Sequence, residues 1–192
     1  MKISCRTCLL SAVLCAALLG GCAGNRPAAD VPEDTNLTAS SGEDADAASP
    51  IVFEARTLDG ALVSSGLFSD AKLTMINVWA TYCNPCLSEM PGLGELAGAY
   101  DSEDFQLIGI ISDVTEDADE AVLQYASDLV DETGAGYPHL LLNESLYTAL
   151  LTEVSAVPTT FFVDQNGQIL DTAVGAMEKS AWEEKINALL ES

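Results

Sequence analysis

The chain alternates between short apolar runs and amphipathic stretches. Residues 73–79 and 105–111 are almost continuously apolar, which is typical of strands buried on both faces of a sheet. Residues 118–132 instead alternate acidic and apolar side chains at helical spacing, which predicts an amphipathic helix. We expect the inner side of this helix to be formed by Val122, Leu123, Tyr125, Ala126 and Leu129.

The same patterns predict the remaining elements. Helices are expected over 85–100, 144–151 and 179–190, and strands over 139–142, 159–163 and 168–174. Asp59-Gly60 predicts a hairpin between 51–57 and 61–63, and Asn166-Gly167 predicts one between the last two strands. The order is hairpin, βαβ, α and then ββα. It predicts an α/β domain with a central mixed, mostly parallel sheet, an antiparallel edge and helices on both faces.

The first residues form a targeting signal. Lys2 and Arg6 precede an apolar run from Leu9 to Leu19, which is too short to span a bilayer comfortably and suits a signal peptide. The run closes on LGGC, which resembles the bacterial lipobox. That resemblance implies cleavage after residue 21 and a lipid on Cys22, so the mature protein would sit on the outer face of the cell membrane or in the periplasm. The alternative is an ordinary cleaved signal peptide with an incidental Cys22.

The next segment, residues 22–49, is rich in Ala, Asp, Glu, Ser, Pro and Thr and has almost no large apolar side chain. Such a segment cannot bury enough surface to offset its ordering entropy, so we expect a disordered acidic tether. The folded domain is then expected to span residues 50–192.

The charge balance is strongly acidic, with 7 Lys and Arg against 30 Asp and Glu and a formal net charge of −23. This balance argues against binding to nucleic acid or to anionic lipid headgroups. It is typical of a solvated surface that keeps a protein soluble.

Two of the six cysteines fall in the expected domain. Cys83 and Cys86 are too close in sequence to staple a domain together. They follow a predicted buried strand and open a predicted helix, where free N–H groups and the helix dipole favour a thiolate. The spacing places both on one helix face, so they can form a small disulfide ring. We expect Cys83, at an exposed tip, to attack a substrate disulfide and Cys86 to resolve the mixed disulfide.

A second motif, Val157-Pro158-Thr159, precedes a predicted strand. Such positions often hold a cis X–Pro bond. A cis proline opposite the cysteines would leave the backbone of Val157 free to pair with an extended substrate segment.

The chain resembles the thioredoxin superfamily, most closely its TlpA/ResA-like membrane-tethered reductases, in residues 79–86 (WATYCNPC), Pro91 and residues 157–167 (VPTTFFVDQNG). The resemblance covers residues 51–190 and implies a thioredoxin-like fold with a β/α insertion between residues 113 and 142. It also implies reduction of disulfides in exported proteins, with electrons from a membrane thiol carrier. Candidate substrates are apocytochrome c, copper-centre assembly proteins and methionine sulfoxide reductases.

Three positions refine this comparison. Thioredoxins proper carry a buried Asp where this chain has Asn77, which cannot act as a base. ResA-like proteins carry a Glu three residues after the second cysteine, where this chain has Glu89, so the resemblance implies that Glu89 accepts the Cys86 proton. The alternative is a solvated charge on the helix face. Tyr82 replaces a common Trp and keeps an aromatic surface beside Cys83, so Tyr82, Val157 and Pro158 are the expected substrate contacts.

Paired cysteines are also found in proteins with other functions. A purely structural disulfide is the simplest alternative, and a zinc site would lack ligands because His139 is the single histidine. Two thiolates with His139 could bind Cu(I), as in Sco-like proteins, although those usually place three residues between their cysteines. A peroxiredoxin-type peroxidase would want a Thr three residues before its reactive cysteine, whereas Thr81 lies two before Cys83. We expect no metal and no cofactor beyond the Cys83–Cys86 pair, and a half-buried His139.

Overall fold

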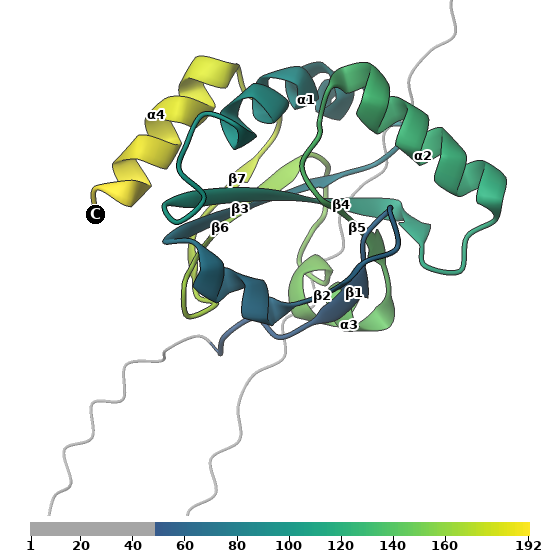
Figure 1. The fold of residues 1–192 in the computed structure, drawn as a ribbon, viewed down its shortest axis with the longest axis horizontal. Helices are drawn as coiled ribbons and strands as arrows, with labels where there is room; N and C mark the ends of the chain where they lie inside the picture. Colours follow the sequence, from purple (N-terminus) through teal and green to yellow (C-terminus); the bar gives the residue numbers. More distant parts are fainter. Residues whose placement is uncertain (1–48) are drawn as a thin grey trace, which may run out of the picture. The chain divides into compact units, whose positions relative to one another are not determined.

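The computed structural model describes residues 49–192 (Figure 1). The expected signal peptide, Cys22 and all of the expected tether up to residue 48 lie outside the described residues. The strands are β1 (Glu54–Arg56), β2 (Leu62–Ser64), β3 (Leu73–Trp79), β4 (Phe105–Thr115), β5 (His139–Leu142), β6 (Thr159–Asp164) and β7 (Ile169–Val174). The helices are the 3-10 helix η1 (Ser65–Asp70), α1 (Asn84–Ala97), α2 (Glu120–Thr133), α3 (Glu144–Leu146), the π-helical turn η2 (Tyr147–Leu151) and α4 (Lys179–Leu190).

The central sheet has the strand order β5-β4-β3-β6-β7, so β3 lies in the middle. β3 pairs in parallel with β4, and β4 with β5. β6 pairs antiparallel with both β3 and β7. The predicted mixed sheet is therefore confirmed, and β6 is the strand of this sheet that runs against the other four. The predicted N-terminal hairpin is also present, as the antiparallel pair β1–β2 with Gly60 at a positive φ of 88°.

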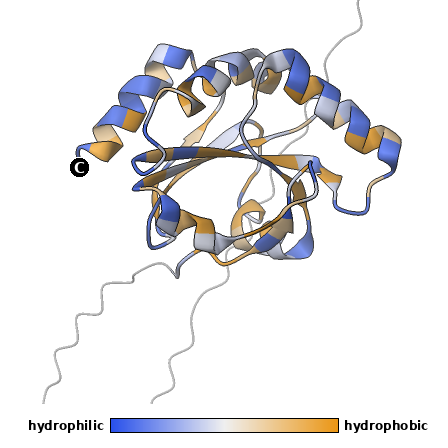
Figure 2. Cartoon of the chain, in the orientation of Figure 1, coloured by the Kyte–Doolittle hydropathy of each residue, from blue (hydrophilic) through white to orange (hydrophobic). Residues whose placement is uncertain are grey.

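Two hydrophobic layers cover the two faces of this sheet. Helices α1, α2 and α4 lie on one face, and the β1–β2 hairpin, η1 and α3 lie on the other (Figure 1). Figure 2 shows the apolar positions of the strands and helices turned toward these two interfaces. Trp79 and Trp182 are fully buried in the layer between the sheet and helices α1, α2 and α4. No helix within the described residues is both long and apolar enough to cross a bilayer.

The period-two alternation of β3 determines what lies beneath α1. Met75 and Trp79 pack in the layer with α1, whereas Ile76 and Val78 pack in the opposite layer. Asn77 therefore faces α1 as well, and it is fully buried although it is polar. A polar side chain in this position needs partners inside the protein.

The prediction for the inner side of α2 is partly wrong. Ala126 and Leu129 are buried and Leu123 packs against them, but Val122 and Tyr125 are 41% and 53% exposed. Val122 lies in the first turn of the helix, where Leu123 and not Val122 packs against the core. Tyr125 lies outside the stripe formed by Leu123, Ala126 and Leu129, about 100° from its centre by helical geometry.

Candidate active site

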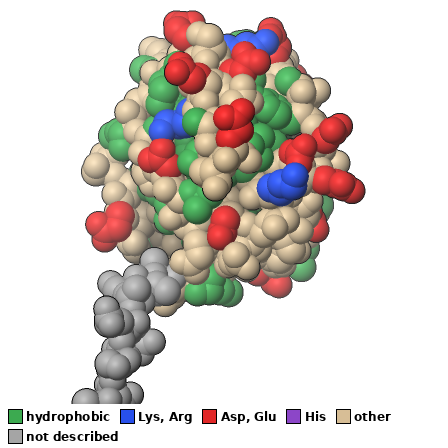
Figure 3. Space-filling view, turned by 90° about the vertical axis from the view of Figure 1, so that its left-hand side faces the viewer, with side chains coloured by type: hydrophobic (Ala, Val, Ile, Leu, Met, Phe, Trp, Pro, Cys, Tyr) green, Lys and Arg blue, Asp and Glu red, His purple; other side chains and the backbone are tan. Residues whose placement is uncertain are grey.

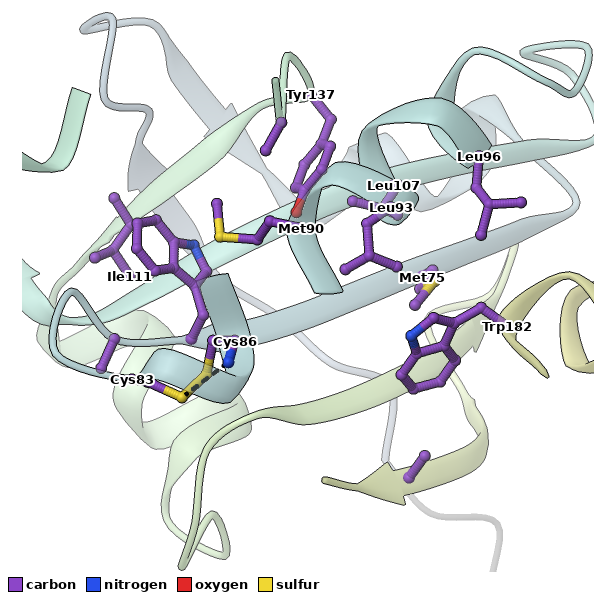
Figure 4. Packing of buried hydrophobic residues seen from close by; sticks show 14 of the residues in the cluster. Met75, Cys83, Cys86, Met90, Leu93, Leu96, Leu107, Ile111, Tyr137 and Trp182 are labelled. Carbon is purple, nitrogen blue, oxygen red and sulfur yellow. Dashed lines mark hydrogen bonds between the residues drawn. A yellow bond between two sulfur atoms is a disulfide. The ribbon is translucent and has the colours of Figure 1, made fainter. Parts of the chain in front are cut away.

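The two cysteines form a disulfide at the start of α1. Cys83 is the N-cap residue, and its Cα lies 5.3 Å from that of Cys86 one turn later. The backbone N–H of Cys86 donates to Sγ of Cys83 over 3.3 Å, shown as the dashed line in Figure 4. Pro85 occupies the first turn, where its missing N–H leaves no hydrogen bond unmade. The helix start thus directs a donor at Cys83, which stabilises a thiolate there in the reduced protein.

The pair is less accessible than the sequence predicts. Cys86 is fully buried, and Cys83 is only 6% exposed, so the expected exposed tip is wrong for this oxidised form. The reason is tertiary: the carbonyl oxygen of Val157 lies 3.6 Å from Sγ of Cys83. Cys83 is nevertheless the outer of the two sulfurs, so its expected role as the attacking cysteine remains a prediction.

The loop that covers Cys83 carries the expected cis bond, between Val157 and Pro158. The loop is fixed on both sides, because Gly175 donates its N–H to the carbonyl of Pro158 over 2.8 Å. Thr159 also donates its hydroxyl to the carbonyl of Ala156 over 2.7 Å. Among the described residues, the N–H of Val157 finds no acceptor. This backbone is therefore available to an extended segment that approaches Cys83.

A hollow of about 240 Å³ adjoins the same loop. It is bordered by Tyr82, which is 74% exposed, and by Val157. The rest of its wall is mainly apolar and comes from η2 and the segment after it: Tyr147, Leu151, Val154, Ser155 and Ala156, with Ser112 and Leu142. The predicted contacts Tyr82 and Val157 thus lie on one surface beside the disulfide. Pro158, which follows Val157, is buried.

Glu89 is buried, so the alternative of a solvated charge on the helix face is wrong. It is 6% exposed, and three N–H groups donate to its carboxylate. Asn77 Nδ2 lies 3.0 Å from Oε1, while the backbone N of Met177 and Nε1 of Trp182 each lie 3.1 Å from Oε2. Burial raises the pKa of the Glu89 carboxyl above its ordinary value, although these three donors oppose the shift. The group is therefore poised nearer to neutral pH than an exposed glutamate, one helical turn from Cys86.

His139 is fully buried, not half-buried as expected, at 3% exposure. Its Nδ1 accepts from Nε1 of Trp79 over 3.1 Å, and its Nε2 lies 2.9 Å from the carbonyl of Ala135. Burial lowers the pKa of His139 to about 4, so the ring is neutral at pH 7. Both ring nitrogens are engaged, and within the described residues no group of three or more His, Cys, Asp or Glu side chains is arranged to hold a metal ion.

Several residues of the site were not found from the sequence. Trp182 and Met177 reach Glu89 from positions about 90 residues further along the chain, and no local motif marks them. Asp113 at the end of β4 accepts from the backbone N and the hydroxyl of Thr81, over 3.0 and 2.5 Å, and so ties down the loop before Cys83. Thr160 could have been inferred once β3 and β6 were paired, because it lies opposite Asn77.

Comparison with known proteins is consistent with this geometry. The model of the Redoxin family matches residues 40–190. The chain belongs to the Redoxin family. Its relatives place this redoxin among the TlpA/ResA-like proteins of the thioredoxin superfamily, as the motifs predicted.

Two relatives and one structure illustrate the similarity. The redoxin is 30% identical over 135 residues to the thioredoxin-like protein YneN of Bacillus subtilis, covering 70% of this chain and 75% of YneN. It is 27% identical over 118 residues to the thiol-disulfide oxidoreductase ResA of Oceanobacillus iheyensis, covering 62% of this chain but only 57% of ResA. A crystal structure of a thiol:disulfide interchange protein from Chlorobium tepidum superposes with a TM-score of 0.62 at 24% identity, covering 74% and 96% of the two chains. This structural likeness confirms the thioredoxin-like fold.

Proposed function

We propose that this protein is an extracytoplasmic protein-disulfide reductase that works through Cys83 and Cys86. The single observation that carries the proposal is the disulfide at the start of α1, with the backbone of Val157 against its outer sulfur. The two cysteines carry the redox equivalents themselves, so the reaction needs no further cofactor. Similarity to proteins named thiol-disulfide oxidoreductase supports the same activity.

The chemistry proceeds in two exchanges. In the reduced protein the Cys83 thiolate attacks one sulfur of a substrate disulfide, the substrate S–S bond breaks, and the other substrate sulfur leaves as a thiolate that takes a proton from water. Cys86 then loses its proton and attacks Sγ of Cys83. The mixed disulfide breaks, the substrate leaves with both its cysteines reduced, and the Cys83–Cys86 disulfide forms. Two electrons have moved from the protein to the substrate.

Glu89 is proposed to take the proton from Cys86. A carboxyl group with a raised pKa can accept a proton near neutral pH and release it again. The release route is a surface hollow of about 410 Å³ between α1 and residues 176–179, with Ser88 and Glu89 among its lining residues. Glu89 would thereby connect the buried Cys86 with solvent through a hollow that shares no lining residue with the hollow bordered by Tyr82.

The substrate is proposed to be an extended segment of an exported protein. Its backbone would pair with Val157 next to Pro158, and an apolar side chain beside its cysteine would enter the hollow bordered by Tyr82. Apocytochrome c and other exported thiol proteins fit this description.

The protein would be anchored through a lipid on Cys22, with residues 22–49 as the tether, and a membrane thiol carrier would restore the dithiol.

The two rival functions predict different contacts. A Sco-like copper site would need His139 as a third ligand, but both ring nitrogens of His139 are already in hydrogen-bond contact, one with Trp79 and one with Ala135. A peroxidase would direct the Thr81 hydroxyl at the sulfur, but that hydroxyl donates to Asp113. Copper titration of the reduced protein and peroxide consumption test these two alternatives.

The proposal is tested by trapping the intermediate. In the full-length Cys86→Ser variant the mixed disulfide cannot be resolved, so an exported disulfide protein should remain bound at Cys83. Peptide mass spectrometry distinguishes this adduct from adducts at the cysteines near the N-terminus. The Cys83→Ser/Cys86→Ser double variant is the control and should carry no adduct in this peptide. Failure to recover any adduct at Cys83 would refute its role as the nucleophile.

A further inference from the structure

The three groups that contact the Glu89 carboxylate all donate hydrogen bonds to it. The backbone N–H of Met177 and Nε1–H of Trp182 can only donate, and both point at Oε2. This arrangement suits an ionised carboxylate. A protonated carboxyl group has an O–H of its own, and in this burial that O–H needs an acceptor.

Asn77 is the partner that can supply one. Its Nδ2 now donates both to Oε1 of Glu89 and to the hydroxyl oxygen of Thr160, over 3.0 and 3.1 Å. Its Oδ1 is buried and has no hydrogen-bond partner. If the amide turned by 180°, Oδ1 would take the place of Nδ2 between the same two groups. It would then accept from the O–H of a protonated Glu89 and from the hydroxyl of Thr160, which can donate as well as accept.

Both orientations of the Asn77 amide leave one polar atom without a hydrogen bond. That atom is Oδ1 in the present orientation and would be Nδ2 after the turn. That unmet hydrogen bond therefore favours neither orientation. The Thr160 hydroxyl can bond to either amide atom, so the protonation state of Glu89 is left as the difference between the two orientations.

We propose that Asn77 is a positioning residue whose side-chain amide turns over with the protonation of Glu89. The inference rests on the proposed function of Glu89 as the proton acceptor for Cys86. When Cys86 gives its proton to Oε1, Asn77 turns from donor to acceptor, and it turns back when the proton leaves to solvent. This explains the use of an amide at position 77: Asn cannot be the base itself, but it can satisfy the base in both of its states.

The test compares Asn77, which can donate to Glu89 or accept from it, with Trp182, which can only donate to it. In the full-length oxidised chain, the titration midpoint of Glu89 is followed by the NMR signal of its carboxyl carbon. Trp182→Phe removes a donor that binds the ionised carboxylate more strongly than the neutral carboxyl, so the midpoint should rise by about one pH unit. Asn77→Leu removes a partner of both forms, so the midpoint should rise clearly less. An equal or larger rise in Asn77→Leu would overturn the proposal.

A second measurement needs no substitution and holds even if a variant fails to fold. In the wild-type chain, contacts between the Asn77 amide protons and the Thr160 side chain should be seen above the Glu89 midpoint and lost below it. Contacts that persist at both pH values would also overturn the proposal. Turnover of Glu89→Gln tests the proposed function separately: unchanged turnover would remove Glu89 from the reaction without affecting these titrations.

Discussion

His139 shows how strongly burial changes the chemistry of a single side chain. The ring is held between Trp79 and Ala135, and Gly109 lies directly beneath it, where an added Cβ would fall 2.2 Å from Nδ1. With a pKa of about 4 in the folded protein, the ring has no charge to offer at neutral pH. We therefore assign it to the support of Trp79 in the layer beneath α1.

The lowered pKa of His139 predicts a loss of stability in mild acid. Between pH 6.5 and about 4 the unfolded chain binds a proton at this position and the folded chain does not, so the free energy of unfolding falls as the pH falls. The shift corresponds to about 3 kcal/mol across that window. In His139→Asn, which does not titrate there, this component should be absent. Denaturant unfolding of both chains from pH 7.5 to 4 measures it, and parallel curves would contradict the prediction.

The close approach of α1 and the end of α2 fixes the active-site helix at the level of the elements. Gly94 in α1 faces the carbonyl oxygen of Gly134, which has a positive φ of 67° and ends α2 as its C-cap residue. A Cβ on Gly94 would lie 2.3 Å from this oxygen. The two helices can only be this close because position 94 has no side chain.

Gly94→Ala should therefore separate these helices. Overpacking against backbone should cost about 2 kcal/mol, more than the gain in helix propensity of about 1 kcal/mol. Gly98→Ala at the end of the same helix is the matched control, because its nearest atom would be 3.9 Å away. Chemical denaturation should show a lower midpoint for Gly94→Ala than for Gly98→Ala. Equal midpoints would mean that the contact is not a constraint.

The acidic surface is the main feature at the scale of the whole molecule. Figure 3 shows Asp and Glu side chains spread over one face, with only a few Lys and Arg among them. The lysines of the described residues, Lys72, Lys179 and Lys185, are paired with Asp104, Glu95 and Asp171. Exposed pairs of this kind add little stability, so the surface acts mainly through its net negative charge.

The direction of electron flow depends on the molecule and its compartment together. The same dithiol reduces or oxidises its substrate according to its reduction potential relative to that of the compartment. This potential can be measured by equilibrating the full-length chain with glutathione buffers. Mass spectrometry of the peptide that contains Cys83 and Cys86 then gives the oxidised fraction. As a reductase fed from across the membrane, the pair should have a potential of roughly −250 mV or lower. A value of about −120 to −180 mV would make the protein an oxidase or isomerase.

The elements and the reactive cysteine pair follow from local patterns in the sequence. Leu73–Trp79, His139–Leu142 and Lys179–Leu190 begin and end where the patterns predict, because apolar runs, turn residues and helical periodicity are local signals. Cys83 and Cys86 were found for the same reason: their spacing, and the strand and helix around them, are contained in a few residues.

The surroundings of the cysteine pair depend on packing between segments that are distant in the sequence. Burial of Cys83 depends on Val157, 74 residues away. Burial of Glu89 depends on Met177, just before the last helix, and on Trp182 within it. From the sequence, Asn77 is only a residue that cannot act as a base. Its hydrogen bond to Glu89 depends on the position of β3 beneath α1 and beside β6. Solvent exclusion and hydrogen bonds between distant segments arise from packing, which the periodicity of any one segment does not contain.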